Sequence, residues 1–225
     1  MRIKIDKRSV IIMDIGLRRI INTTLLDNDG IIKKGNFLIN KQGDYRISNG
    51  DEDVIETIDG SNRLFTRSLQ NWHTHMAMIL NRSMGEGLPL EEWLQKSIWP
   101  VEKKLTKQFV EIGSKAAAAE LISTGTTFAC DMYFHPEVVG KVISDTGLRG
   151  IICGPITDFP FTSNEQDSDS ALNQVKNLIS QGSSAPERVE YGIGNHSVYA
   201  CSEETLRKAS EISKKTGCKL SIHTS

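Results

Sequence analysis

The sequence has 225 residues, 38% hydrophobic and 24% charged, enough for one large or two small folded domains. Its 27 Lys and Arg against 28 Asp and Glu give a net charge of −1, without the basic excess of nucleic-acid or anionic-membrane binders. No apolar run approaches the roughly 20 residues of a membrane span, and no secretory signal is evident. We therefore expect a soluble, cytoplasmic protein with no nucleic-acid or membrane partner.

The four cysteines are far apart in the sequence. Cys130, Cys153, Cys201 and Cys218 form no Cys-x-x-Cys pair. In a chain of this length, such spacing favours reduced, partly buried thiols over a disulfide framework or a zinc–thiolate site.

Residues 1–66 have the pattern of a small β-structure. Short apolar stretches, among them Val10–Met13, alternate with turn sequences such as Asp27-Asn28-Asp29-Gly30. This pattern predicts several short antiparallel strands, forming a β-sandwich segment distinct from residues 67–225. We expect the acidic run Asp51-Glu52-Asp53 and the pair Arg18-Arg19 to be solvated.

From about residue 70 the pattern changes to alternating strands and helices. The predicted strands are 69–72, 126–132, 148–153, 189–194 and 218–222, and the predicted helices are 107–123, 136–146, 169–179 and 203–216. In the first helix we expect one buried face made of Phe109, Ile112, Ala116, Ala119 and Ile122. Alternation of this kind predicts a parallel sheet with helical crossovers.

Histidines stand at the ends of four of these five strands. His73 and His75 follow the first strand, His135 the second, His196 the fourth, and His223 ends the fifth. Carboxyl ends of parallel strands meet at one edge, and residues two apart in an extended segment project to the same side. A His-x-His pair by itself also fits two unrelated surface histidines. Together with His223, it predicts a metal site made of His73, His75 and His223.

Other polar and aromatic residues give weaker indications. Asp131 lies near a strand end, and Asp158 lies in a loop. His135 precedes Pro136, so a structural role at a helix start is favoured for it. We expect Trp93 and Trp99, with Leu90 and Leu94, to pack under the loop after the first strand.

Several enzyme classes are excluded by missing motifs. The sequence has no His-Glu-x-x-His helix, no Pro-Cys-x-x-Cys of the zinc nucleobase deaminases, no Gly-x-Ser-x-Gly and no phosphate-binding P-loop.

Longer motifs resemble the amidohydrolase superfamily, in the branch of chlorohydrolases and methylthioadenosine/S-adenosylhomocysteine deaminases. The resemblance extends from about residue 60 to the end of the chain. It is carried, in the family's order, by Asn71-Trp72-His73-Thr74-His75-Met76-Ala77-Met78, Leu88-Pro89-Leu90-Glu91-Glu92-Trp93-Leu94, Ile98-Trp99-Pro100-Val101-Glu102, Asp131-Met132-Tyr133-Phe134, Asn195-His196-Ser197-Val198-Tyr199-Ala200-Cys201-Ser202 and Ile222-His223-Thr224-Ser225.

This resemblance implies a metal-dependent hydrolase on a (β/α)8 TIM-type barrel with a small β-sandwich. His73, His75 and His223 match metal ligands for one divalent ion, zinc or alternatively iron. Glu102 matches the acid that holds the ribose hydroxyls of nucleosides, and His196 matches a histidine that contacts the substrate. The implied reaction is hydrolytic deamination of adenosine-type nucleosides or related N-heterocycles by metal-activated water.

Two short segments depart from the family pattern. Arg67-Ser68 replaces the usual Pro-Gly before the first barrel strand. Cys153-Gly154-Pro155 stands where the nucleoside deaminases carry an arginine for the far end of the substrate, so that role is not assigned.

The chain also contains about five strand–helix units where a barrel of this type has eight. The family's glutamate three residues after the third histidine, and its later histidine and aspartate, would lie beyond Ser225. We therefore expect the N-terminal part of a longer enzyme, with no catalytic acid or base among these residues. The alternatives are a split half needing a C-terminal partner, an incomplete fragment, a dechlorinating or guanine-type hydrolase, a metal-binding scaffold and a homo-oligomer.

Overall fold

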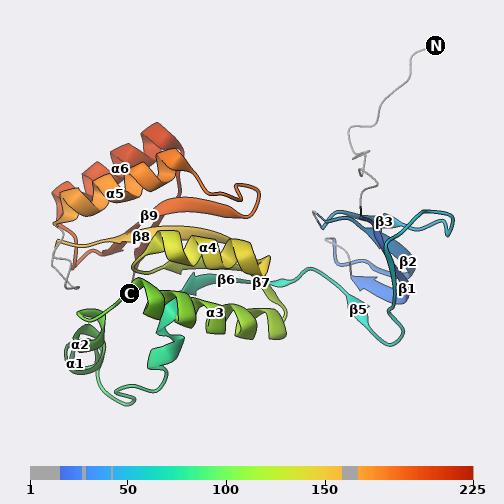
Figure 1. Cartoon of the computed structure of the whole chain (residues 1–225), viewed down its shortest axis with the longest axis horizontal. Coiled ribbons are helices and arrows are strands. Elements are labelled where there is room, and N and C mark those ends of the chain that lie inside the picture. Colours follow the sequence, from blue (N-terminus) through green and yellow to red (C-terminus); the bar gives the residue numbers. More distant parts are fainter. Residues whose placement is uncertain (1–15, 27–28, 42, 159–166, 225) are drawn as a thin grey trace, which may run out of the picture. The chain divides into compact units, whose positions relative to one another are not determined.

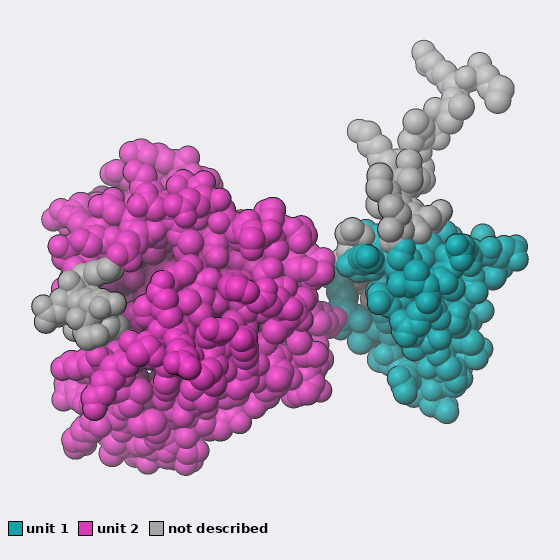
Figure 2. Space-filling model, viewed as in Figure 1, with its two compact units in different colours: residues 1–67 teal, residues 68–225 magenta. Residues whose placement is uncertain are grey.

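The structure, a computed structural model, describes residues 16–26, 29–41, 43–158 and 167–224. The chain divides into two compact units, residues 1–67 and 68–225 (Figure 2). The apolar stretch Val10–Met13, for which a strand is predicted, lies outside the described residues.

The first unit contains one five-stranded sheet. Its strands are β1 (Arg18–Leu26), β2 (Ile32–Ile39), β3 (Tyr45–Ile47), β4 (Glu56–Asp59) and β5 (Leu64–Phe65). The β1–β2 and β2–β3 pairs are antiparallel, as predicted. The β4 and β5 strands pair with β1 in parallel, so the expectation of antiparallel strands is wrong for them. The segment after β3 leads the chain to the far side of β1, where a hairpin would have kept it beside β3.

Glu52 holds this segment to the sheet. Its carboxylate forms ion pairs with Arg19 and Arg46, each at 3.2 Å, and accepts a hydrogen bond from the Ser48 hydroxyl at 2.8 Å. The backbone N–H of Asn49 donates to it as well and, together with the other donors, lowers the pKa of Glu52 to about 2. The Arg19 and Glu52 side chains are only 16% and 14% exposed, so the expectation that both are solvated is wrong.

The second unit is built from alternating strands and helices (Figure 1). Its strands are β6 (Leu69–Thr74), β7 (Thr126–Met132), β8 (Arg149–Ile156), β9 (Val189–Ser197) and β10 (Leu220–His223). Its helices are α1 (Leu90–Trp93), α2 (Trp99–Glu102), α3 (Lys107–Ser123), α4 (Pro136–Thr146), α5 (Ser168–Gln181) and α6 (Glu203–Thr216), with a 3-10 helix η1 (Met76–Asn81) and a π-helical turn η2 (Leu94–Ile98). The five strands are all parallel in the order β10-β9-β8-β7-β6, which confirms the predicted strand–helix alternation.

Helix ends in this unit follow the local sequence signals. The side chains of Thr106, Asp167 and Ser202 accept hydrogen bonds from backbone N–H groups three residues later, at the starts of α3, α5 and α6. Gly147 and Gly217 end α4 and α6 with φ of +79° and +75°, which glycine adopts without steric cost. Among the described helices, none combines the length and apolar character needed to cross a bilayer.

The buried face of α3 differs from the prediction. The buried residues are Val110, Gly113, Ser114, Ala117 and Ala118. Ile112 and Ile122, expected in the core, are 52% and 48% exposed. The reason is the close approach of η1: a Cβ on Gly113 would lie 2.5 Å from the carbonyl oxygen of Ala77. Small residues allow this contact, and they outweigh the larger apolar side chains in setting the helix orientation.

The four longer helices α3 to α6 pack on one face of the sheet. Ala129 and Ile152 belong to the core cluster with α3 and α4, and Ile156 and Ile193 to the cluster with α5 and α6. The strand register puts these four residues on the same side. The other face carries a smaller cluster that includes Cys153. All four cysteines are free thiols, as expected.

Candidate metal centre

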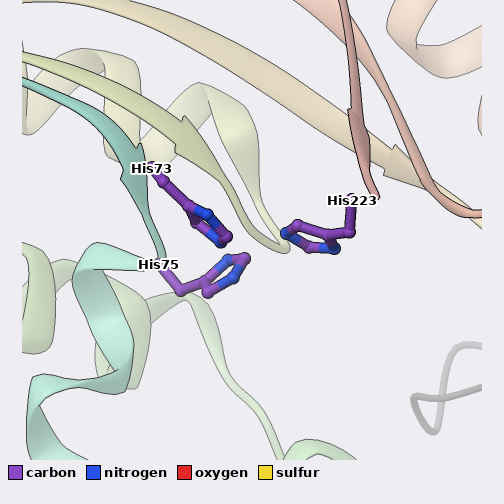
Figure 3. A group of neighbouring side chains, drawn as sticks. All are labelled: His73, His75 and His223. Carbon is purple, nitrogen blue, oxygen red and sulfur yellow. The ribbon is translucent and has the colours of Figure 1, made fainter. Parts of the chain in front are cut away.

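Three histidines from opposite edges of the sheet converge at its carboxyl end. One ring nitrogen from each of His73, His75 and His223 lies within 4.8 Å of the others (Figure 3). His73 and His75 come from β6 and the turn after it, and His223 comes from β10. In a flat five-stranded sheet, four spacings of about 4.8 Å would separate the edge strands by about 19 Å. The ring centroids of His73 and His223 are 4.9 Å apart, so the sheet curls strongly.

An irregularity in β6 lies at the His73–His75 pair. Asn71 pairs with Ala129 and Thr74 with Asp131, so three steps along β6 match two along β7. This is the pattern of a β-bulge, which redirects side chains locally. His75 lies beyond the strand, just before η1. The two rings, two residues apart, therefore meet where the regular pairing of β6 ends.

The surroundings of His75 and His223 suit metal binding. The His75 Nδ1 lies 2.6 Å from the Met132 carbonyl oxygen, so Nδ1 donates and Nε2 is left as the ligand atom. Burial, with smaller effects of His73 and His196, lowers the pKa of His75. Burial, followed by the charges of His75 and His73, also lowers the pKa of His223. Neutral imidazoles bind metal, so this donor set fits a divalent ion of the zinc or iron type.

His196 lies beside this group of three. It is in β9, one residue before the strand end, and its ring centroid is 5.1 Å from that of His223. Burial, helped by the charge of His223, lowers the pKa of His196 to about 4. His196 therefore presents a neutral imidazole next to the three proposed ligands.

All four histidines line one cavity of about 320 Å³. Most of the remaining wall is apolar and includes Met78, Leu90, Trp93, Leu94, Ile98, Trp99, Met132, Tyr133, Phe134, Pro155, Val198 and Tyr199. Glu102, at the end of α2, is the only carboxylic acid among the described lining residues and is 7% exposed. Burial raises the pKa of Glu102 to about 7, and the Tyr133 hydroxyl partly offsets the rise. The cavity thus joins a buried acid to the histidine cluster.

The aromatic wall was missed from the sequence. Trp93 and Trp99, with Leu90 and Leu94, line the cavity, a role that the prediction of packing under the loop did not include. Tyr133 and Phe134 were named only as part of a family motif and were given no role in the site, although they directly follow a strand that ends at the histidine edge. Extending the rule about strand ends to aromatic residues would have found these two.

Two further residues named in the sequence analysis, His135 and Asp158, lie at the starts of helices and outside the cavity. His135 lies at the start of α4 with φ of +55°, 3.8 Å from Glu137, and is not among the cavity residues. The Asp158 carboxylate accepts hydrogen bonds from the Thr205 hydroxyl at 2.6 Å and from the Ser202 backbone. Burial opposes ionisation of Asp158, but these hydrogen bonds outweigh it and lower the pKa to about 2. Asp158 therefore helps to hold the start of α6.

Comparison with known proteins gives a consistent family match. Residues 68–225 match the amidohydrolase family. The chain is 37% identical over 207 residues to a 5'-deoxyadenosine deaminase of Methanosphaera stadtmanae, covering 91% of this chain and 48% of that protein. It is 35% identical over 178 residues to a 5-methylthioadenosine/S-adenosylhomocysteine deaminase of Thermoanaerobacter pseudethanolicus, covering 79% and 41%.

A solved structure gives the same fold. An adenosine deaminase from Xanthomonas campestris with bound zinc superposes with a TM-score of 0.83 at 23% identity, covering 92% of this chain and 48% of that one. The strands and helices of residues 68–225 therefore match part of a TIM-type barrel. The chain spans about half the length of the relatives it matches.

Proposed function

The chain belongs to the amidohydrolase family, and on that premise we propose that it supplies the metal-binding portion of a hydrolytic deaminase. The proposed substrates are adenosine-type nucleosides or related N-heterocycles, in line with the names of the two relatives above. The observation that carries this proposal is the convergence of three imidazoles on a cavity that also contains a buried acid.

In this proposal His73, His75 and His223 hold one divalent ion, zinc or alternatively iron. Such an ion supplies a bound water with a pKa near 7 when it is present. The role of His75 is to offer Nε2 while Met132 holds its Nδ1–H. The reaction replaces an amino group by the oxygen of water and releases ammonia.

Glu102 is proposed to bind the polar part of the substrate. A carboxylate that is 7% exposed gains from hydrogen-bond donors because burial without partners is costly. Paired hydroxyls of a ribose are donors of the right kind. His196, beside the proposed ligands, would contact the substrate near the reacting carbon.

The apolar wall is proposed to bind the ring and the uncharged parts of the substrate. Trp93 and Trp99 offer flat aromatic surfaces, on which a heterocycle can stack. Burial of the ring against this wall would also remove water from the reacting face. The described lining residues include no Lys or Arg.

A second candidate function is that of one half of a two-part enzyme. Within the described residues, β6 pairs only with β7 and β10 only with β9, so each leaves one edge unpaired. Unpaired parallel edges are sites where further strands can add. A partner carrying the remaining barrel strands would complete the sheet, and it would supply the acid–base residues that we do not assign here.

Ammonia release tests both candidates. The chain would be incubated with zinc, alone and mixed with the C-terminal half of the Methanosphaera relative. The substrates would be 5'-deoxyadenosine, methylthioadenosine, adenosine and guanine, with a chlorinated triazine assayed for chloride. We expect ammonia from the adenosine derivatives in the mixture. Absence of ammonia from all of them in both preparations overturns the deaminase proposal, and full activity of the chain alone overturns the two-part proposal.

A further inference from the structure

A buried carboxylate on β7 holds the backbone on both sides of His75. Asp131 is completely buried. Its Oδ1 accepts a hydrogen bond from the Met76 backbone N–H at 2.5 Å and lies 3.0 Å from the Thr74 hydroxyl. The same hydroxyl lies 3.0 Å from the Cys130 carbonyl oxygen. Thr74 and Met76 are the two neighbours of His75, so one carboxylate oxygen fixes the turn that carries this ring.

This contact is placed where regular strand pairing stops. The bulge in β6 precedes Thr74, and the strand ends at that residue. Beyond it, the Met76 N–H has no place in the sheet ladder, and Asp131 accepts it instead. The next residue of β7, Met132, receives the His75 ring through its carbonyl oxygen. Adjacent residues of β7 therefore hold the backbone and the ring of one proposed ligand.

Core packing alone does not account for an aspartate at this position. The other carboxylate oxygen, Oδ2, is buried without a hydrogen-bond partner among the described residues. A buried carboxylate oxygen without a hydrogen-bond partner costs stability. The aspartate nevertheless provides one hydrogen-bond acceptor that Thr74 and Met76, the two neighbours of His75, share.

We infer that Asp131 is a positioning residue for the metal site, acting through the turn at residues 74–76 to hold His75 in its ligating position. This inference rests on the proposed metal site. Groups that orient metal ligands from behind typically change metal affinity 10- to 100-fold when removed. Asp131 differs from the usual case because it holds the ligand's backbone, while the ring is held by Met132.

The test compares Asp131→Ala with Asp131→Asn in the whole chain. The readouts are the zinc Kd, from competition with a chromophoric chelator, and the visible absorption of the cobalt-loaded protein. Asp131→Ala is expected to weaken zinc binding 10- to 100-fold and to shift the cobalt spectrum. Asp131→Asn retains an oxygen acceptor at Oδ1, so its zinc Kd is expected to stay within about threefold of wild type.

Val175→Ala is the matched control for general loss of stability. Val175 is buried between α5 and the sheet, in a core cluster that contains none of the histidines. This substitution should lower the melting temperature and leave the zinc Kd and the cobalt spectrum unchanged. If it weakens zinc binding as much as Asp131→Ala does, the role of Asp131 is merely structural and the inference is wrong.

Thr74→Val keeps the test decisive if Asp131→Ala does not fold. It removes one of the two donors to Asp131 with little change in side-chain volume, and it should weaken zinc binding by a smaller factor. Wild-type zinc affinity in both Thr74→Val and any folded Asp131→Ala overturns the inference. Failure of the wild-type chain itself to bind zinc would instead overturn the proposed metal site.

Discussion

Glu102 is an ionisable residue in buried surroundings that disfavour its charged form. Its side chain lies among aromatic and aliphatic residues of the cavity wall, and it is 7% exposed. Burial therefore raises the pKa of Glu102 to about 7, from an ordinary value of 4.5. Between those two values the folded protein holds a proton that the unfolded chain has lost. The contribution of Glu102 to stability is consequently greatest below pH 4.5 and is lost as the pH rises through 7.

Glu102→Gln is expected to stabilise the metal-free chain at pH 8. The substitution removes a penalty of about 3 kcal/mol that the charged carboxylate carries above pH 7. At pH 5 the same substitution should change the unfolding free energy by less than about 1 kcal/mol, because the wild-type side chain is then largely protonated in the folded state. Urea unfolding at the two pH values, with a chelator present, measures both differences.

Glu190→Gln, at an exposed position of β9, is the matched control for this experiment. Glu190→Gln should not raise the free energy of unfolding at pH 8 by a comparable amount. An equal effect of Glu102→Gln at pH 5 and pH 8 would contradict the assignment of a buried, charge-disfavouring site. The proposed substrate role adds that the stabilised variant should bind nucleosides more weakly than wild type.

At the level of single residues, the sequence predicted which histidines meet but not what holds them. Residue type and position at strand ends were sufficient to group His73, His75 and His223. The contributions of Asp131 and Met132 depend on a bulge in β6, which the sequence pattern does not indicate. Glu102 was reached only through the family resemblance, because its burial is a tertiary property.

At the level of elements, helix bounds were predictable and helix orientation was not. Thr106 and Gly147 mark helix ends through local backbone chemistry, so α3 and α4 begin and end where expected. The orientation of α3 depends instead on Gly113, which permits η1 to approach. Because α3 is rich in alanine, its apolar pattern is compatible with more than one buried face. Contact with η1 determines which face of α3 is buried, and the sequence pattern of α3 alone does not give the position of η1.

Gly113→Ala is expected to destabilise the chain by about 1–2 kcal/mol. The added methyl group would meet backbone atoms of Ala77, which cannot move as a flexible side chain can. This overpacking exceeds the gain of about 1 kcal/mol that alanine normally brings to a helix. Gln108→Ala, at an exposed position of the same helix, should change stability by less than about 0.5 kcal/mol. A stabilised Gly113→Ala, measured by urea unfolding, would show that η1 does not pack as described.

At the level of the second unit, residues 68–225, the curl of the sheet makes the histidine site depend on the whole fold. The proposed ligands lie on β10, the turn after β6 and β6 itself, which are first and last in the strand order. Every strand between them must be in register for the rings to meet. The parallel alternation could be predicted from the sequence, but the degree of curl could not, because it arises from sheet twist and helix packing together.

Zinc is therefore expected to stabilise the second unit against unfolding. An ion that binds only the folded form contributes about 2.7 kcal/mol at a concentration 100 times its Kd. For a chain of this size that corresponds to a rise in melting temperature of roughly 5–11 °C. Differential scanning calorimetry with zinc, and again after chelation, measures the change. Mg²⁺ is the matched control because it prefers oxygen ligands, and an equal rise with Mg²⁺ would argue against an imidazole site.

The most direct test of the shared metal site is the zinc content of single histidine variants. Equilibrium dialysis followed by atomic absorption should find one zinc per wild-type chain and a large loss in His73→Ala, His75→Ala and His223→Ala. His135→Asn is the control, because His135 lies outside the cavity and asparagine tolerates its positive φ. This variant should still bind one zinc per chain. Tightly bound zinc at one equivalent in His223→Ala would contradict a site shared between the two edges of the sheet.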